Sequence, residues 1–275
     1  MFDSDSKLRH LPFFEEIAAL EDNSAAWYAA TAGLVTLRLV DSWLESGGGH
    51  VSDDEWNFKS VCAAVDKVSE RSPMQALLTS VLGAMGQREA SIRAVVPSLM
   101  AYAKALEWDA KWELAVDVYE TLLAHLHPVE EAGACVDAHL RLGVCCRSLQ
   151  QMDRALAAYA CVFEIGNATG DIEAILRSRM GEADLAMWRG NLPHAASQFD
   201  ALIDSAAKAG LRDVHARALM GRAGVAIMAK QYELAIRLGY ESLQNQDSPV
   251  ERDRVLSNIA AAFLSLGVFS AARDA

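Results

Sequence analysis

The 275-residue sequence predicts an all-α fold, a solenoid in which antiparallel helix pairs are stacked. Ala (48 residues) and Leu (32 residues) dominate the composition, and both are strong helix formers. Small and aromatic residues recur every forty positions, and a fixed period of about 20 to 50 residues is the signature of a solenoid. Helix start and stop signals also recur along the chain. These observations argue against a sandwich, a barrel or a Rossmann fold.

Helix boundaries are marked by capping and turn residues. Gly47-Gly48-Gly49 ends an amphipathic stretch, and Ser52-Asp53-Asp54-Glu55 is a capping box that begins the next helix. Ser72-Pro73 places an N-cap residue before a proline at the first helical position. Further breaks fall at Pro128, Gly170, Gly210 and Pro249. We expect about fourteen helices joined by short turns.

The repeat is clearest at one alanine position and its neighbours. Ala115, Ala155, Ala195 and Ala235 lie forty residues apart, and Ala272 follows after thirty-seven. Twelve residues before these stand Ala103, Gly143, Ala183, Ala223 and Ala260, and four residues after the first three stand Tyr119, Tyr159 and Phe199. Small residues let two helix backbones approach closely, and an aromatic ring one turn later fills the space beside the contact. Each unit should therefore be an antiparallel helix pair.

This pattern resembles the tetratricopeptide repeat (TPR) superfamily. The residues that carry the resemblance best are Gly143-Ala155-Tyr159, Ala183-Gly190-Ala195-Phe199 and Ala223-Ala235. The resemblance implies a right-handed superhelical solenoid over residues 96–275, with units near 96–127, 136–169, 176–209, 216–246 and 253–275. The period of forty exceeds the usual 34, which predicts longer helices, and the aromatic is lost at Gly239. Units of this length are similar to those in the regulatory regions of bacterial signalling proteins.

Residues 1–95 repeat less clearly and are strongly acidic. Up to Glu70 they hold thirteen acidic and five basic residues. The end unit of a solenoid must cover an apolar stacking face with a polar outer surface. We therefore expect an atypical N-terminal helical cap or degenerate repeats, with a dedicated acidic docking surface as the alternative.

Charge and hydropathy restrict the partners and the compartment. The net charge of -12 argues against binding to nucleic acid or to an anionic membrane. The longest uncharged run, Val255–Ala272, is interrupted by polar residues and is too short to span a bilayer. The chain begins with acidic residues, whereas a secretory signal begins with basic ones. We expect a cytoplasmic protein whose five cysteines, an odd number, are reduced thiols.

The sequence shows no common catalytic signature. No P-loop, dinucleotide-binding, zinc-protease or nucleophile-elbow motif is present. Cys135 and His139 are four residues apart on an expected helix, but Cys145, Cys146 and Cys161 fall on other faces. We predict no catalytic residues, no metal site and no cofactor, and an enzyme with a site in the groove is the lowest-ranked alternative. His125 and His127, before Pro128, should be solvated.

The TPR resemblance implies a concave groove lined by the first helix of each pair. The residues that it places there are Lys104, Trp108, Arg141, Arg147, Arg177, Met180, Asp184, Trp188, Arg217, Met220, Arg254 and Asn258. The alternative is that the large apolar residues at helical spacing form the core between pairs. That alternative concerns Trp108, Trp112, Tyr119, Met180, Met187 and Trp188.

Three arginines occupy the same position in successive units. Arg177, Arg217 and Arg254 should form a ladder beside flexible methionines, which suits a peptide with a carboxylate and apolar anchors. The alternative is that they pair with acids on neighbouring helices and only hold the stack together. The acids in question are Glu173, Asp213 and Asp253.

We therefore predict a non-enzymatic scaffold that binds a protein or peptide partner with an acidic segment. The first alternative is a regulatory segment of a larger bacterial signalling protein, with a diguanylate-cyclase-type or transcriptional output domain beyond residue 275. At the C-terminal end, Ile259, Phe263, Leu266 and Phe269 should leave an apolar stacking face uncovered, which predicts a homodimer through the last repeat.

Overall fold

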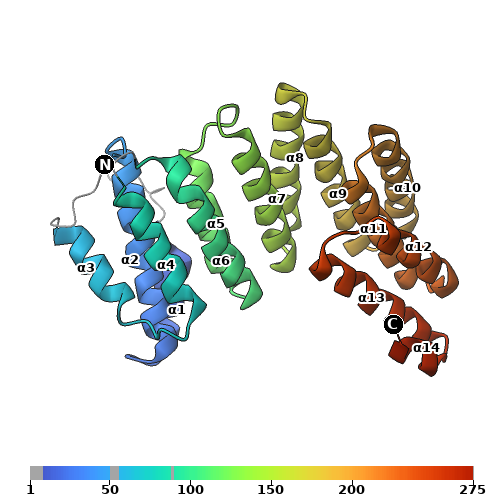
Figure 1. Ribbon diagram of the computed structural model, residues 1–275, viewed down its shortest axis with the longest axis horizontal. Helices are drawn as coiled ribbons and strands as arrows, with labels where there is room; N and C mark the ends of the chain where they lie inside the picture. Colours follow the sequence, from blue (N-terminus) through green and yellow to red (C-terminus); the bar gives the residue numbers. More distant parts are fainter. Residues whose placement is uncertain (1–8, 50–55, 88–89, 275) are drawn as a thin grey trace. The chain divides into compact units, whose positions relative to one another are not determined.

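The computed structural model describes residues 9–49, 56–87 and 90–274, and all regular structure in those ranges is helical (Figure 1). The all-α prediction is confirmed. The helices are α1 (Leu11–Ala19), α2 (Ala25–Glu45), α3 (Trp56–Val65), α4 (Pro73–Met85), α5 (Ile92–Trp108), α6 (Trp112–His125), α7 (Ala132–Ser148), α8 (Met152–Thr169), α9 (Ile172–Trp188), α10 (Leu192–Ala209), α11 (Arg212–Met228), α12 (Tyr232–Gln244), α13 (Pro249–Ser265) and α14 (Phe269–Asp274). The capping box at residues 52–55 lies outside the described ranges.

The chain forms two compact units. Unit 1 is Met1–Gln151 and holds α1 to α7, whereas unit 2 is Met152–Ala275 and holds α8 to α14. The boundary that we predict at residue 95 concerns the regularity of the repeat and stays a prediction.

Unit 1 is a stack of helices in which each element packs against the next. In addition, α2 contacts α4 and α6, α1 contacts α6, and α5 contacts α7. Leu37, Leu78 and Leu99 are fully buried between these helices. The predicted cap of α4 is confirmed, since the Ser72 side chain accepts a hydrogen bond from the backbone N–H of Met74. Pro73 suits the first position of α4, because the backbone N–H that proline lacks would have no hydrogen-bond partner within the helix.

Unit 2 repeats one packing unit. Each helix packs against its successor, α9 also contacts α11, and α11 also contacts α13. The first helices of successive pairs therefore form a row, which we call the α9–α11–α13 row. Ala155 and Ala195, expected at the helix crossings, are both fully buried.

In two successive pairs of unit 2, the aromatic residue packs against a glycine of the next helix. A Cβ on Gly181 would lie 2.6 Å from the Tyr159 ring, and a Cβ on Gly221 would lie 2.3 Å from the Phe199 ring. Both distances are impossible for an unshifted side chain, so glycine lets the aromatic ring reach the backbone of the next helix. This contact locks α8 to α9 and α10 to α11.

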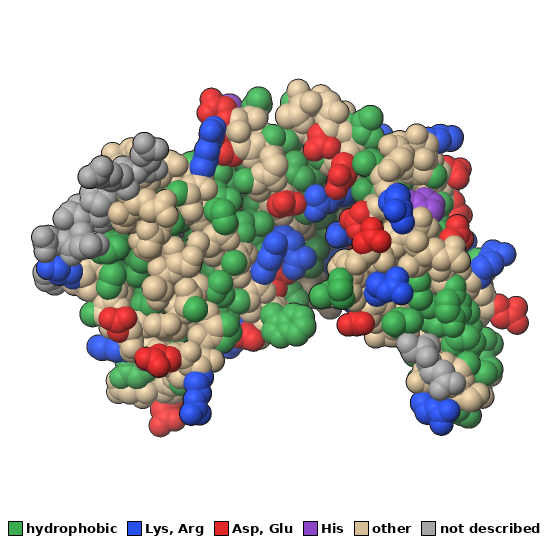
Figure 2. Space-filling model, in the orientation of Figure 1, with side chains coloured by type: hydrophobic (Ala, Val, Ile, Leu, Met, Phe, Trp, Pro, Cys, Tyr) green, Lys and Arg blue, Asp and Glu red, His purple; other side chains and the backbone are tan. Residues whose placement is uncertain are grey.

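The fourth unit makes a similar close contact, but here the glycine lies on the earlier helix and the large side chain on the later one. Gly239 stands where the aromatic is expected, and its missing Cβ would lie 2.6 Å from the Ile259 side chain of α13. Ile259 is only 1% exposed, so the expectation that it is uncovered is wrong. Leu266 and Phe269 are 42% and 70% exposed, as expected, and Figure 2 shows hydrophobic side chains gathered over this end of unit 2.

The run from Val255 to Ala272 is divided between α13 and α14, which are separated by a turn at Gly267 with positive φ. None of the helices in the described ranges is long and apolar enough to cross a bilayer.

Candidate functional site

The arginine ladder lies on the α9–α11–α13 row of unit 2. Arg177, Arg217 and Arg254 are each the sixth residue of their helices, and α11 contacts both α9 and α13. The forty-residue repeat therefore places three guanidinium groups at equivalent positions on adjacent helices.

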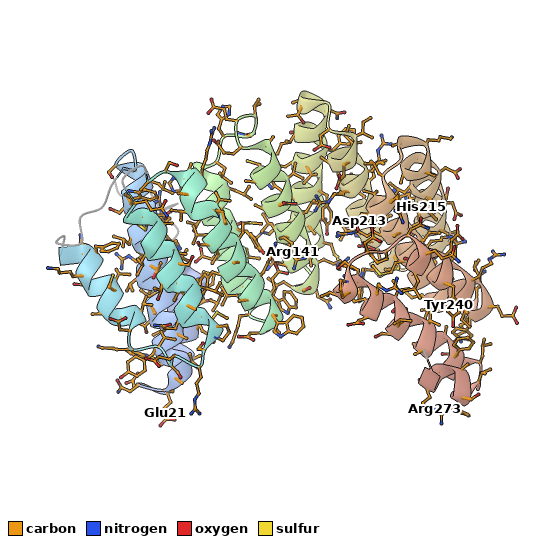
Figure 3. The ribbon with its side chains drawn as sticks, in the orientation of Figure 1. Glu21, Arg141, Asp213, His215, Tyr240 and Arg273 are labelled. Carbon is orange, nitrogen blue, oxygen red and sulfur yellow. The ribbon has the colours of Figure 1, made fainter. Side chains whose placement is uncertain are left out.

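Each of these arginines is paired with a carboxylate one turn earlier on its own helix. The pairs are Arg177–Glu173 (3.9 Å), Arg217–Asp213 (3.0 Å) and Arg254–Glu251 (3.1 Å). Glu173 and Asp213, two of the acids named for the structural alternative, are therefore partners, but each lies on the helix of its own arginine, and Glu251 takes the place of Asp253. Figure 3 labels Asp213 at the start of α11. Pairs within one helix cannot hold neighbouring helices together.

The pairs of Arg217 and Arg254 hold these two guanidinium groups only weakly. Exposed pairs spaced three or four residues apart on a helix contribute only about 0.3–0.5 kcal/mol. The side chains of Arg217 and Asp213 are 36% and 53% exposed, and the contact at 3.0 Å is made by the buried Nε of Arg217, without hydrogen-bond geometry. A ligand carboxylate that binds a guanidinium through two hydrogen bonds would compete well with such a partner.

Arg141 is bound in a different way, although it was expected in the same groove. Its Nε donates to Glu107 Oε1 over 2.9 Å, its terminal nitrogen donates to Glu107 Oε2, and the Tyr119 hydroxyl donates to Glu107 Oε1 over 2.5 Å. The Glu107 side chain is only 5% exposed. Arg141, labelled on α7 in Figure 3, therefore joins α7 to α5.

Burial and charge shift the titration of this cluster. Burial raises the pKa of Tyr119, and the hydrogen bond to Glu107 raises it further. Burial alone would lower the pKa of Arg141, but the hydrogen bond to Glu107 and the Glu107 charge outweigh that effect and raise it. The cluster keeps Tyr119 neutral and Arg141 charged at any physiological pH, which suits a structural contact.

The ladder residues share their helix faces with apolar side chains. On α9, Arg177, Met180, Asp184 and Trp188 follow the three- and four-residue spacing of one helix face. Met180 and Asp184 are half-buried, and Trp188 is 59% exposed. On α11, Arg217 and the half-buried Met220 occupy the matching positions, and Asn258 of α13 is half-buried near Arg254.

The remaining expected groove residues belong to unit 1. Lys104 and Trp108 lie on α5 and Arg147 on α7; Lys104 is exposed, and Arg147 is half-buried. Trp108 is 87% exposed, so the alternative that assigns it and Trp188 to the core is wrong. The same alternative holds for Tyr119, which is fully buried.

The cysteine and histidine residues on α7 are poorly suited to nucleophilic or metal chemistry. Burial raises the pKa of the Cys135 and Cys145 thiols, and burial lowers the pKa of His139. A thiol must ionise to attack or to bind a metal. In the part of the chain that the structure describes, no three Cys, His, Asp or Glu side chains converge as metal ligands would.

A second polar cluster ties the start of α1 to α2 and α6. His10 Nδ1 lies 3.0 Å from Asp117 Oδ2, His10 Nε2 lies 3.3 Å from Asp41 Oδ2, and His125 Nε2 lies 3.0 Å from Asp41 Oδ1. Arg9 also bonds Asp41. His125 was expected to be solvated, and that expectation is wrong because its side chain is only 17% exposed.

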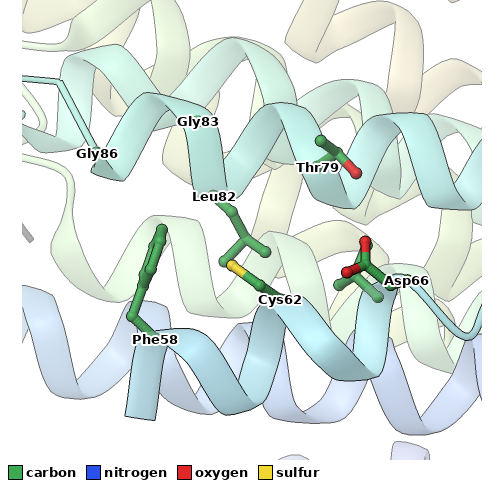
Figure 4. A pocket seen from close by; sticks show the side chains of 8 residues that line it. Phe58, Cys62, Asp66, Thr79, Leu82, Gly83 and Gly86 are labelled. Atoms are coloured by element: carbon green, nitrogen blue, oxygen red, sulfur yellow. The ribbon is translucent and has the colours of Figure 1, made fainter. Parts of the chain in front are cut away.

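Unit 1 also contains a cavity of about 360 Å³ between α3 and α4 (Figure 4). Its apolar lining includes Phe58, Leu82 and Gly83, and its polar lining includes Cys62, Asp66 and Thr79. Among the described residues that line it there is no histidine and no cationic side chain, so nothing in this lining favours ionisation of the Cys62 thiol.

Sequence comparison identifies no relative, since no protein-family model and no curated protein matches the chain. Solved structures do match. The Rap conjugation gene regulator of the plasmid pLS20, in complex with the Phr* peptide, is 13% identical with a TM-score of 0.58 over 89% of this chain and 72% of that chain. NprR in complex with its cognate peptide NprX is 14% identical with a TM-score of 0.54 over 95% of this chain and 67% of that chain.

A third match is a tetratricopeptide repeat protein from Parabacteroides merdae. It is 16% identical with a TM-score of 0.51 over 88% of this chain and 90% of that chain. At these identities the likeness shows the fold. The chain has a TPR-like helical fold, as the forty-residue repeat predicts.

Proposed function

We propose that the protein is a non-catalytic peptide receptor whose ligand lies on the α9–α11–α13 row of unit 2. The observation that carries the proposal is the ladder of Arg177, Arg217 and Arg254 at equivalent positions of three adjacent helices, in which Arg217 and Arg254 are held only by weak pairs on their own helices. Arginine binds carboxylates through two parallel hydrogen bonds. The ligand is a peptide segment with acidic and apolar side chains.

Two kinds of evidence support a peptide ligand. Apolar side chains with flexible thioethers, including Met180 and Met220, share the faces of the arginines and can adapt to an apolar anchor. In addition, two of the solved structures with this fold hold peptides, the Rap regulator with Phr* and NprR with NprX.

A regulatory role is the second candidate, favoured by the same comparisons. The Rap protein is described as a conjugation gene regulator. For this chain, the proposal is that peptide binding regulates an output domain or a partner protein in the cytoplasm. Hydrogen exchange of the full chain with and without a bound peptide tests it, since regulation requires that protection changes outside the row.

The binding proposal is tested with a displayed library of random heptapeptides selected on the full chain. We expect enrichment of acidic residues, and binding that weakens as salt rises. The double substitution Arg217→Glu/Arg254→Glu should abolish binding and barely change the melting temperature, because each of these two pairs contributes little.

The matched control is Lys208→Glu/Arg237→Glu, which makes the same charge change on exposed residues of α10 and α12. This control should bind normally. Loss of binding in both double variants would show that net charge alone drives capture. A large loss of stability in the ladder variant would show that its arginines hold the fold together.

A further inference from the structure

Two glycines of α11 have very different surroundings. Gly221 is required by packing, because a Cβ there would lie 2.3 Å from the Phe199 ring. Gly224 comes three residues later, and a Cβ there would meet only Met187 Sδ at 3.6 Å, an ordinary contact. Glycine in the middle of a helix is less stable than alanine. Packing within the chain therefore gives no reason for glycine at position 224.

The face of α11 at Gly224 is the face that carries Arg217. Arg217, Met220, Gly224 and Met228 follow the helical spacing of three, seven and eleven residues from the first, so they lie along one side of α11. Met187 reaches Gly224 from α9, and Met228 is 48% exposed. We call this open position the Gly224 notch; Met187 contacts it, and Met220 and Met228 lie on the same side of α11.

The equivalent position on the neighbouring helix is chemically opposite. Asp184 of α9 stands forty residues before Gly224, and its carboxylate would repel an acidic peptide and disfavour an apolar side chain. At the Gly224 notch the one side chain within 4 Å of the missing Cβ is the uncharged thioether of Met187. Methionine side chains adapt their shape to the group that they contact.

We propose that the Gly224 notch is the subsite for an apolar side chain of the peptide whose acidic group binds Arg217. This inference rests on the proposed function and specifies the ligand. Seven residues separate Arg217 from Gly224, a distance of about 10 Å along a helix. An extended peptide covers that distance in about three residues. The ligand motif is therefore an acidic residue followed or preceded, about three positions away, by a residue such as Leu, Met or Phe.

The experiment uses heptapeptides enriched on the full chain, synthesised with a fluorescein label and measured by fluorescence anisotropy. We expect the enriched sequences to contain the spaced acidic and apolar residues. Gly224→Leu fills the notch and should weaken binding at least tenfold. Replacing the apolar peptide residue with Ser should weaken binding to the original protein but hardly change binding to the Gly224→Leu variant.

Two controls separate binding from folding. Gly224→Ala fits the available space and should raise the melting temperature, whereas Gly221→Ala should lower it because of the Phe199 ring. Should Gly224→Leu fail to fold, Met228→Ser provides the second test. Its side chain is half exposed, so the fold should tolerate the change while the labelled peptide binds several-fold more weakly.

The outcomes distinguish this inference from the proposed function. If no peptide is enriched, or Arg217→Glu leaves binding unchanged, the peptide-receptor proposal fails and the notch proposal fails with it. If binding depends on Arg217 but is equal in the original protein, Gly224→Leu and Met228→Ser, only the notch proposal is overturned. Enriched peptides without the spaced apolar residue would overturn it as well.

Discussion

Arg141→Leu should destabilise the protein far more than Arg217→Leu, although both arginines were assigned to one groove. Arg141 donates two hydrogen bonds to the Glu107 carboxylate and Tyr119 donates one, and the Glu107 side chain is only 5% exposed. Removing one partner of a buried ion pair costs about 3–5 kcal/mol. The Arg141 side chain is 40% exposed, so water can reach the Glu107 carboxylate once Arg141 is replaced. The free energy of unfolding should therefore fall by only about 2–3 kcal/mol.

The expected effect is easily measured. A loss of about 2–3 kcal/mol lowers the melting temperature of a unit of this size by about 5–10 °C. Arg217→Leu removes a pair worth about 0.3–0.5 kcal/mol, which corresponds to about 1–2 °C. Circular dichroism at 222 nm during heating, with urea titrations at 25 °C, gives both quantities.

A double substitution tests the cause of the loss. Glu107→Gln removes the buried charge but keeps an oxygen that accepts the Tyr119 hydrogen bond. Glu107→Gln/Arg141→Leu should therefore be more stable than Arg141→Leu alone. The reasoning is refuted if Arg217→Leu is as destabilising as Arg141→Leu, because the ladder arginine would then be structural too.

Three further substitutions test the repeat, the buried histidine and the exposed end. Ala195→Leu should cost about 1–3 kcal/mol by overpacking a fully buried helix crossing, and a neutral result in urea titration would contradict the assigned repeat position. Burial alone would lower the pKa of His10, but Asp117 and Asp41 raise it from 6.5 to about 9. The stabilisation that protonated His10 provides is therefore complete below pH 6.5 and disappears as the pH rises through about 9. The urea midpoint should fall over that pH range, and it should fall less in the His10→Gln variant. Light scattering should give a mass near twice 29.8 kDa, and Phe269→Glu should shift it towards the monomer; a concentrated monomer would contradict a homodimer through the last repeat.

The fold follows from the sequence because each packing rule is local and repeated. Ala155 and Ala195 are buried where the period places them, since only a small side chain fits between closely approaching helices. The same holds for Gly181 on the next helix, where the Tyr159 ring leaves no room for a Cβ. The contact of Gly239 with Ile259 was not predicted, because the sequence showed only that the aromatic residue is lost at position 239.

The partners of charged residues were less predictable. Arg141 and the ladder arginines lie on equivalent helices, yet Arg141 meets a buried carboxylate from α5 and the others meet carboxylates on their own helices. The choice depends on which acid lies within reach and how well it is shielded from water. Helical periodicity predicts the helix face on which a residue lies, but it predicts neither the distance to the nearest acid nor the burial of that acid.

The exposed tryptophans show which kind of sequence information governs burial. Their residue type favours the core, yet Trp108 is 87% exposed and Trp188 is 59% exposed. Met228 lies forty residues after Trp188 and is 48% exposed. Ser148 lies forty residues before Trp188 and is exposed as well. All four residues end the first helix of a pair. Since a serine and two tryptophans share this exposure, the position in the repeat determines burial here, and side-chain hydrophobicity determines only what the exposed position can bind.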